Sequence, residues 1–140
     1  MLSRDELVYV NEIQNSYLLK LVIPKISFEK EIYEIASELN NVDYNVEILK
    51  TSEIDKNVYF FASHSGRGDN CYFNRVKELY VGDNIYVNIG SNLLVYEVVS
   101  IYNIVKSGYM EVDNNLENVL FLITCSNYNR QLIVKGVLIN

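Results

Sequence analysis

The sequence predicts a mainly β protein, built as a sandwich or a barrel, and three observations lead to this fold class. Short apolar segments recur along the chain at a spacing of roughly 8–12 residues, separated by turn-forming residues. The 140 residues include 12 tyrosines, a residue type enriched in strands, and a single proline. Apolar residues make up 49% of the chain, which argues against a disordered protein.

The first third of the chain is expected to combine strands with short helical segments. Apolar residues at three-residue spacing predict a short amphipathic helix over residues 4–16, within an N-terminal segment of residues 1–17. Residues 18–28 predict a strand that Pro24 interrupts, since proline suits an edge or a bulge. One or two helical turns are expected in residues 29–41, followed by a weakly alternating segment up to Leu49.

The middle of the chain starts with a short apolar run, residues 57–63, that predicts a buried strand. The next segment, residues 64–70 (HSGRGDN), is typical of a loop, and residues 71–79 have helical spacing. Residues 84–90 and 93–105 predict two strands of a hairpin, because Gly90 and the polar residues after it favour a turn.

The last third is expected to hold two more strands. Residues 106–118 form a polar connection, and the fully apolar run 119–125 (VLFLITC) predicts a buried strand. A short SNYN loop then leads into a final strand over residues 130–139. The length of the chain predicts one domain, residues 1–140.

Composition excludes several classes of function. With 12 Lys and Arg against 18 Asp and Glu, the chain carries a net charge of −6, whereas nucleic-acid binding needs a clustered basic face. Two cysteines exclude a disulfide scaffold, and with a single histidine they make no zinc set. The acidic residues Glu111, Asp113 and Glu117 are expected to be a solvated loop rather than a calcium site. No P-loop or dinucleotide motif is present, so we expect no cofactor.

No part of the sequence predicts a membrane span or a signal peptide. No apolar run approaches the roughly 18–20 residues that cross a bilayer. The first 16 residues are charged and polar throughout.

Three residues next to predicted strands could carry chemistry. His64 follows an apolar strand, where it is either a surface histidine or a general base. Cys125 ends another strand and is either a small buried apolar residue or a nucleophile activated by a nearby cation. Arg130 opens the last strand, where it is either exposed or close to Cys125 across the hairpin, with donors for an oxyanion. Cys71 has no second feature near it and is expected to be structural.

These residues, in this order and spacing, resemble the sortases, the cysteine transpeptidases of Gram-positive cell surfaces. The resemblance lies in FFASHSG (60–66), VGDNIYV (81–87), FLITC (121–125), RQLIVKGVLI (130–139) and the opening segment LLKLVIPKISFEKEIYE (18–34). It implies a closed eight-stranded β-barrel with one or two short helices. Ser63 stands where the family usually has glycine before the histidine, and the loop between Cys125 and Arg130 is short.

The resemblance also implies roles. Cys125 would attack the carbonyl of a C-terminal sorting signal and form a thioester, His64 would pair with the thiolate and protonate the leaving amine, and Arg130 would stabilise the oxyanion. Ala62, Ile123 and Thr124 match positions of the substrate pocket.

The implied partners are surface proteins that bear sorting signals and an amine acceptor, either a cell-wall peptide or a pilin lysine. The implied location is the extracytoplasmic face of the plasma membrane, through an N-terminal membrane anchor that is not found in this sequence. We expect that the anchor was removed by truncation; the alternative is a protein that naturally lacks it. The short connections favour a compact class, D-like.

Two other hypotheses remain open. The chain could be a sortase-like cysteine hydrolase that cleaves without transfer. It could also be an inactive, barrel-shaped binding module in which His64, Cys125 and Arg130 are remnants.

Overall fold

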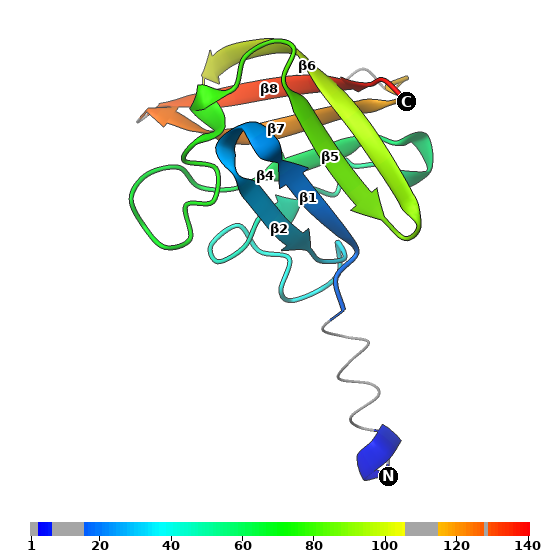
Figure 1. The fold of residues 1–140 in the computed structure, drawn as a ribbon. Coiled ribbons are helices and arrows are strands. Elements are labelled where there is room, and N and C mark those ends of the chain that lie inside the picture. The colour runs from blue at the N-terminus through cyan, green and yellow to red at the C-terminus, as the bar shows by residue number, and fades with distance from the viewer. Residues whose placement is uncertain (1–2, 7–15, 106–114, 128) are drawn as a thin grey trace.

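The computed structural model describes residues 3–6, 16–105, 115–127 and 129–140. Its eight strands form one sheet in the order β2-β1-β5-β6-β8-β7-β4-β3. The strands are β1 (Leu19–Ile23), β2 (Phe28–Ile32), β3 (Glu47–Ile48), β4 (Tyr59–Ala62), β5 (Asn84–Ile89), β6 (Asn92–Val105), β7 (Val119–Asn127) and β8 (Arg130–Leu138). The sheet curls into a nearly closed barrel whose unpaired edges are β2 and β3 (Figure 1). The predicted eight-stranded, mainly β architecture is therefore confirmed.

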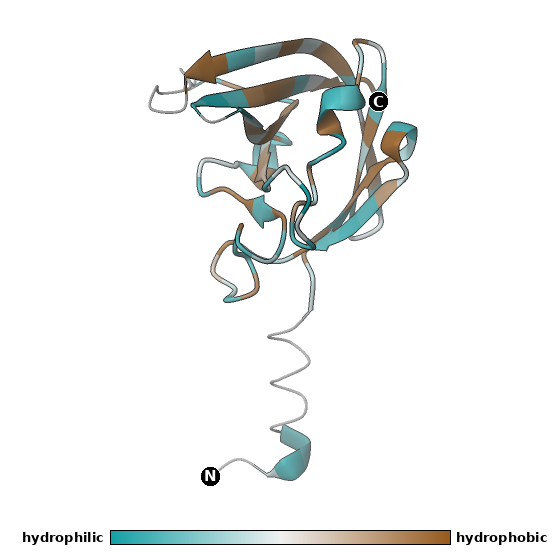
Figure 2. Ribbon diagram, turned by 90° about the vertical axis from the view of Figure 1, so that its left-hand side faces the viewer, coloured by the Kyte–Doolittle hydropathy of each residue, from teal (hydrophilic) through white to brown (hydrophobic). Residues whose placement is uncertain are grey.

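Helical structure within the described residues is limited to short turns. Three 3₁₀ turns occur, η1 (Pro24–Ile26), η2 (Ile54–Lys56) and η3 (Val76–Glu78), together with a helical turn at residues 4–6. Most of the predicted N-terminal helix, residues 7–15, lies outside the described residues. Apolar residues concentrate on the strands, whereas the turn at residues 4–6 is hydrophilic (Figure 2). No described helix has the length and hydropathy needed to cross a membrane.

The prediction of helical turns in residues 29–41 is wrong at its start. Residues 28–32 instead form β2, which pairs antiparallel with β1 in the register Ile23↔Phe28 to Leu19↔Ile32. Pro24 opens the η1 turn that reverses the chain between the two strands, and Ser27 completes this turn in the left-handed region at φ 52°. The hydrogen-bonded pairing with β1 therefore outweighs the helix-like spacing of apolar residues at the start of this segment. Similarly, the predicted helix over residues 71–79 is reduced to the three residues of η3.

One pair of strands in the sheet is parallel, and this pair positions the candidate site. Tyr59 to Ala62 of β4 lie opposite Leu120 to Ile123 of β7. Strands of a parallel pair are commonly buried on both faces, so their sequences are continuously apolar rather than alternating. The runs YFFA and VLFLI have this character, which explains why they were recognisable as buried strands.

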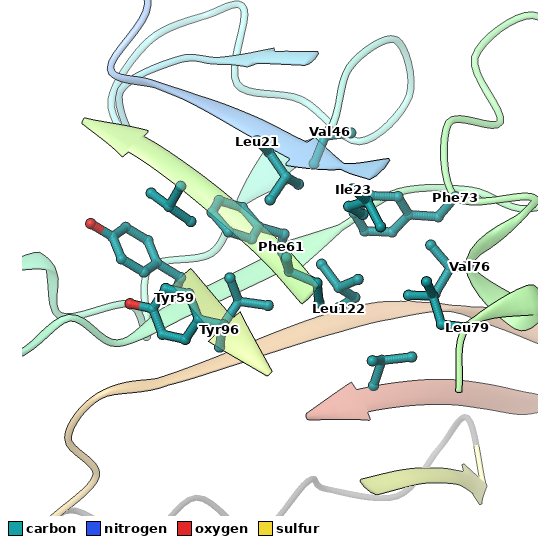
Figure 3. Packing of buried hydrophobic residues seen from close by; sticks show 14 of the residues in the cluster. Leu21, Ile23, Val46, Tyr59, Phe61, Phe73, Val76, Leu79, Tyr96 and Leu122 are labelled. Atoms are coloured by element: carbon teal, nitrogen blue, oxygen red, sulfur yellow. The ribbon is translucent and has the colours of Figure 1, made fainter. Parts of the chain in front are cut away.

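Apolar side chains fill both faces of this part of the sheet. Side chains alternate along each strand, so Tyr59, Phe61 and Leu122 point into the barrel and join its main core (Figure 3). A second, smaller cluster lies on the other face and is built around the stacked rings of Phe60 and Phe121, whose centroids are 4.8 Å apart. We call it the outer cluster; its buried members are Val58, Phe60, Val119, Phe121 and Ile133.

Candidate active site

The parallel register of β4 and β7 brings His64 level with Cys125. Ala62 is the partner of Ile123, and the backbone N–H of Ser63 donates to the Ile123 carbonyl at 3.2 Å. His64 lies two residues after Ala62, and Cys125 lies two residues after Ile123. The two residues are therefore level with each other on neighbouring segments. Contact continues beyond the strand, since the Ser65 hydroxyl donates to the Cys125 carbonyl at 2.6 Å.

Cys125 is a free, half-buried thiol near the end of β7. The alternation along β7 puts its side chain on the same face as Phe121 and Ile123, the face of the outer cluster. The register shifts directly after it, between Cys125 and Asn127, which marks a bulge at Ser126. Bulges bend a strand and re-aim its side chains, and they are over-represented beside active sites.

The imidazole of His64 has Asp43 as its hydrogen-bond partner. The His64 Nε2 and Asp43 Oδ1 atoms are 3.2 Å apart, and the His64 side chain is 45% exposed. The backbone is also fixed, because the Phe73 N–H donates to the His64 carbonyl at 3.1 Å. Among the residues described, His64 makes no hydrogen bond to Cys125, so the two groups are neighbours in register rather than a bonded pair.

Arg130 opens β8, as expected, but it does not lie directly opposite the cysteine. The bulge shifts the ladder so that Arg130 pairs with Asn127, while Gln131 pairs with Cys125. Arg130 is exposed. Within the described ranges, its guanidinium forms no salt bridge with an Asp or Glu side chain. Gln131 shares the face of Cys125, because residues directly opposite each other in an antiparallel ladder point to the same side, and its amide is a hydrogen-bond donor.

The three residues predicted to contact substrate lie on two faces. Ala62 and Ile123 are direct partners across β4 and β7, half-buried, and on the face of Cys125. Thr124 is 4% exposed and points to the opposite face, where its hydroxyl has no hydrogen-bond partner.

A hollow of about 400 Å³ opens beside the candidate nucleophile. Thr124, Cys125 and Ser126 form its β7 wall, and the loop after β4 supplies Ser65, Gly66 and Asn74. Asn103 of β6 and Lys77 of η3 also line it. Phe73 and Leu132 of the main core complete the lining, so the hollow lies on the Thr124 side of β7 and adjoins Cys125 at the strand end.

The remaining sequence candidates carry no comparable arrangement. Cys71 is half-buried in the loop after β4, where its sulfur packs beside Gly66 and Gly68. In the described part of the chain, no group of three His, Cys, Asp or Glu residues could hold a metal ion. Glu111 and Asp113 lie outside the described residues.

Comparison with known proteins decides the family. A sortase domain model matches residues 21–139, which includes all strands except the first two residues of β1. The chain belongs to the sortase family. Sortases are cysteine transpeptidases of Gram-positive cell surfaces, so the predicted resemblance is confirmed. No curated protein matches the chain.

Solved sortase structures share the fold at low sequence identity. Sortase C1 of GBS pilus island 1 is 21% identical with a TM-score of 0.76, over 89% of this chain and 64% of that one. Sortase C-1 of Actinomyces oris is 22% identical with a TM-score of 0.74, over 99% and 83%. Sortase A of Corynebacterium diphtheriae is 21% identical with a TM-score of 0.76, over 99% and 70%. The chain therefore spans less than two thirds of the first of these structures.

Sequence reasoning missed two residues of the site. Asp43 lies far from His64 in the chain, in a segment with only weak alternation, so no local pattern links the two residues. Gln131 is the register partner of Cys125, but the sequence argument considered only Arg130, the first residue of the strand. Counting back from the apolar residues of β8 along a regular ladder could have identified it.

Proposed function

We propose that this sortase domain is an active cysteine transpeptidase in which Cys125 is the nucleophile, His64 the acid and base, and Arg130 the oxyanion donor. The observation that carries the proposal is the parallel register of β4 and β7, which sets His64 beside Cys125. His64 follows the strand next to Cys125, and Arg130 opens the strand on its other side, so both side chains come from the segments that flank the half-buried thiol.

The reaction divides into two acyl transfers. The Cys125 thiolate attacks the carbonyl carbon of the sorting signal, and Arg130 donates hydrogen bonds to the oxyanion. The C–N bond breaks as the His64 imidazolium protonates the leaving amine, and a thioester remains on Cys125. An incoming amine then attacks the thioester and gives its proton to His64, and the thiolate leaves.

The sorting signal is proposed to bind over the outer cluster. This face carries Cys125 together with the half-buried side chains of Ala62 and Ile123, which lie next to the buried apolar residues of the outer cluster. Thr124 lies on the opposite face and would act through the polar pocket beside Cys125. The acceptor is proposed to be an amine of a cell-wall peptide or a pilin lysine, at the extracytoplasmic surface. The D-like class remains a prediction.

Intact-mass spectrometry with a library of sorting-signal peptides, with and without triglycine or a lysine amine, tests the proposal. We expect an acyl adduct on Cys125 that the amine converts to a joined peptide. The Cys125→Ala variant should form neither, whereas Cys71→Ala is the matched control and should form both. His64→Ala should nearly abolish transfer.

Three outcomes would contradict the proposal in different ways. Near-normal transfer by Cys125→Ala would exclude the mechanism. An adduct that water but not the amine resolves would indicate a hydrolase. No adduct with any peptide, together with slow alkylation of Cys125 by iodoacetamide, would indicate a binding module.

A further inference from the structure

The carboxylate of Asp43 is the group that holds the only histidine of the chain. Asp43 Oδ1 lies 3.2 Å from His64 Nε2, although the two residues are 21 positions apart and come from different loops. An ionised carboxylate only accepts hydrogen bonds, so in this contact Nε2 carries the hydrogen. The other ring nitrogen, Nδ1, has no partner among the described residues and is left for the substrates.

The loop that delivers Asp43 is held in place by side-chain hydrogen bonds to its own backbone. The Asp43 N–H donates to Asn41 Oδ1 at 2.8 Å, and the Val42 N–H donates to Glu47 Oε1 at 3.0 Å. Two buried or half-buried amides complete the frame: Asn45 donates to the Leu39 carbonyl at 2.7 Å, and Asn40 binds the N–H of Ile48 in β3 at 2.8 Å.

This frame is anchored in the barrel rather than free in solvent. Val46 is fully buried in the main core, and β3 pairs with β4, the strand that leads to His64. Asp43 is therefore fixed relative to the same strand as its imidazole partner. The fold thus sets the backbone position of Asp43, from which its exposed carboxylate, with 77% of the side chain accessible, reaches His64.

We propose that Asp43 is a positioning residue for His64: it fixes the hydrogen on Nε2 and so makes Nδ1 the nitrogen that exchanges protons with the two amines. The inference rests on the proposed transpeptidase function. In the first half-reaction the imidazolium gives the Nδ1 proton to the leaving amine and becomes neutral with hydrogen on Nε2. In the second, the incoming amine returns a proton to Nδ1. The Nε2–H bond to Asp43 is kept throughout.

Nitrogen-15 NMR of His64 reads out this tautomer directly, because the chain has one histidine. In the neutral imidazole of the unaltered protein we expect the chemical shifts of a ring protonated on Nε2. In Asp43→Ala they should move toward those of a mixture of tautomers. Asp55→Ala, an exposed aspartate with no described ion pair, is the matched control and should leave the shifts unchanged.

The kinetic test uses the same variants. Asp43→Ala should lower the kcat of transpeptidation roughly tenfold or more, a fraction of the 10²–10⁴-fold that general acid–base catalysis supplies. Asp43→Glu should recover part of the loss, and Asp55→Ala should match the unaltered protein. Because an exposed ion pair contributes little to stability, thermal unfolding of Asp43→Ala should be unchanged.

The possible failures are separable. If Asp43→Ala keeps either the shifts or the rate of the unaltered protein, Asp43 does not position the imidazole for catalysis, and this inference is overturned alone. Alkylation of Cys125 by iodoacetamide, which needs no sorting signal, tests the underlying function. If His64→Ala leaves both this alkylation and the transfer rate unchanged, the proposed pairing of His64 with Cys125 fails, and the inference fails with it.

Discussion

Three buried hydroxyl groups in the described residues lack a hydrogen-bond partner, those of Tyr59, Ser63 and Thr124. Burying a hydroxyl without a partner costs about 1–3 kcal/mol in proteins. Two of the three lie one position before the candidate catalytic residues, Ser63 before His64 and Thr124 before Cys125. Both hydroxyls are buried on the face of the sheet opposite Cys125, so each is an uncompensated polar group inside the barrel next to a candidate catalytic position.

The third hydroxyl, of Tyr59, is far from this site and allows a direct test of the cost. Tyr59→Phe removes an unpartnered buried hydroxyl, so we expect the free energy of unfolding to rise by up to about 1–2 kcal/mol. Its core neighbour Tyr96 donates to the Asn57 carbonyl at 2.7 Å, so Tyr96→Phe should lose about 1 kcal/mol. Urea unfolding of both variants measures the two effects. Equal changes of the same sign would contradict this account.

Arg130 is expected to act through the geometry of its planar guanidinium. Arg130→Lys should lower kcat/KM about 10²-fold or more, because a lysine ammonium does not reproduce the fixed fork of donors to an oxyanion. Arg4→Lys, outside the matched sortase domain, is the control. Steady-state transfer kinetics measure both. Full activity of Arg130→Lys together with a large loss in Gln131→Ala would instead make Gln131, the register partner of Cys125, the donor.

At the scale of elements, two irregularities shape the strands around the site. The bulge after Cys125 shifts the end of the β7–β8 ladder, so that Arg130 pairs with Asn127. A second shift of register lies between Val98 and Ser100 of β6, the long strand that pairs with β8. Gly136 of β8 lies where this shift begins, between its partners Val98 of β6 and Leu120 of β7. Close backbone approach, rather than a turn, explains the glycine at this position.

A side chain at position 136 would collide with the neighbouring strand. A Cβ there would lie 3.2 Å from Tyr96 Cβ and 3.4 Å from the Glu97 carbonyl oxygen. Tyr96 is fully buried and hydrogen-bonded, so it has little room to move. Gly136→Ala should therefore lower the free energy of unfolding by about 1–3 kcal/mol, as overpacking does. Gly68→Ala, where the nearest atom is the Cys71 sulfur at 3.4 Å, is the control for urea unfolding. An effect no larger than that of the control would show that β6 and β8 can move apart.

At the scale of the whole molecule, the barrel closes around two tyrosines in one core. Tyr59 and Tyr96 are fully buried and meet edge to face, with ring centroids 6.3 Å apart. Burial raises the pKa of Tyr59, and burial together with the neighbouring Tyr59 raises the pKa of Tyr96. A phenolate in either position would be a charge inside the apolar core. The stability of the barrel is therefore tied to pH on the alkaline side.

The sign of this dependence follows from the unfolded chain. There a tyrosine ionises near its ordinary pKa of about 10, whereas in the folded protein it stays neutral to higher pH. The stabilising contribution is complete below pH ~10 and is lost as pH rises toward the raised pKa values. The free energy of unfolding should thus fall above pH ~10, by up to about 1.4 kcal/mol per pH unit for each buried tyrosine.

Urea unfolding, repeated at intervals of about half a pH unit from about pH 8 to about pH 11.5, measures how steeply the free energy of unfolding falls with pH. The double variant Tyr59→Phe/Tyr96→Phe should show a shallower fall. Tyr80→Phe, at a position that is 69% exposed, should show the slope of the unaltered protein. The same slope in all three proteins would assign the alkaline loss to other groups.

The sequence by itself determined the mainly β class, the two buried strands before His64 and Cys125, and the family. These depend on local patterns, because continuous apolar runs predict buried strands and the motifs around the two residues are short. Only the tertiary structure decided that residues 28–32 are a strand, that Gln131 rather than Arg130 faces Cys125, and that Asp43 holds His64. Each of these depends on which segments pair with one another and in which register, and no local pattern in the sequence states that pairing.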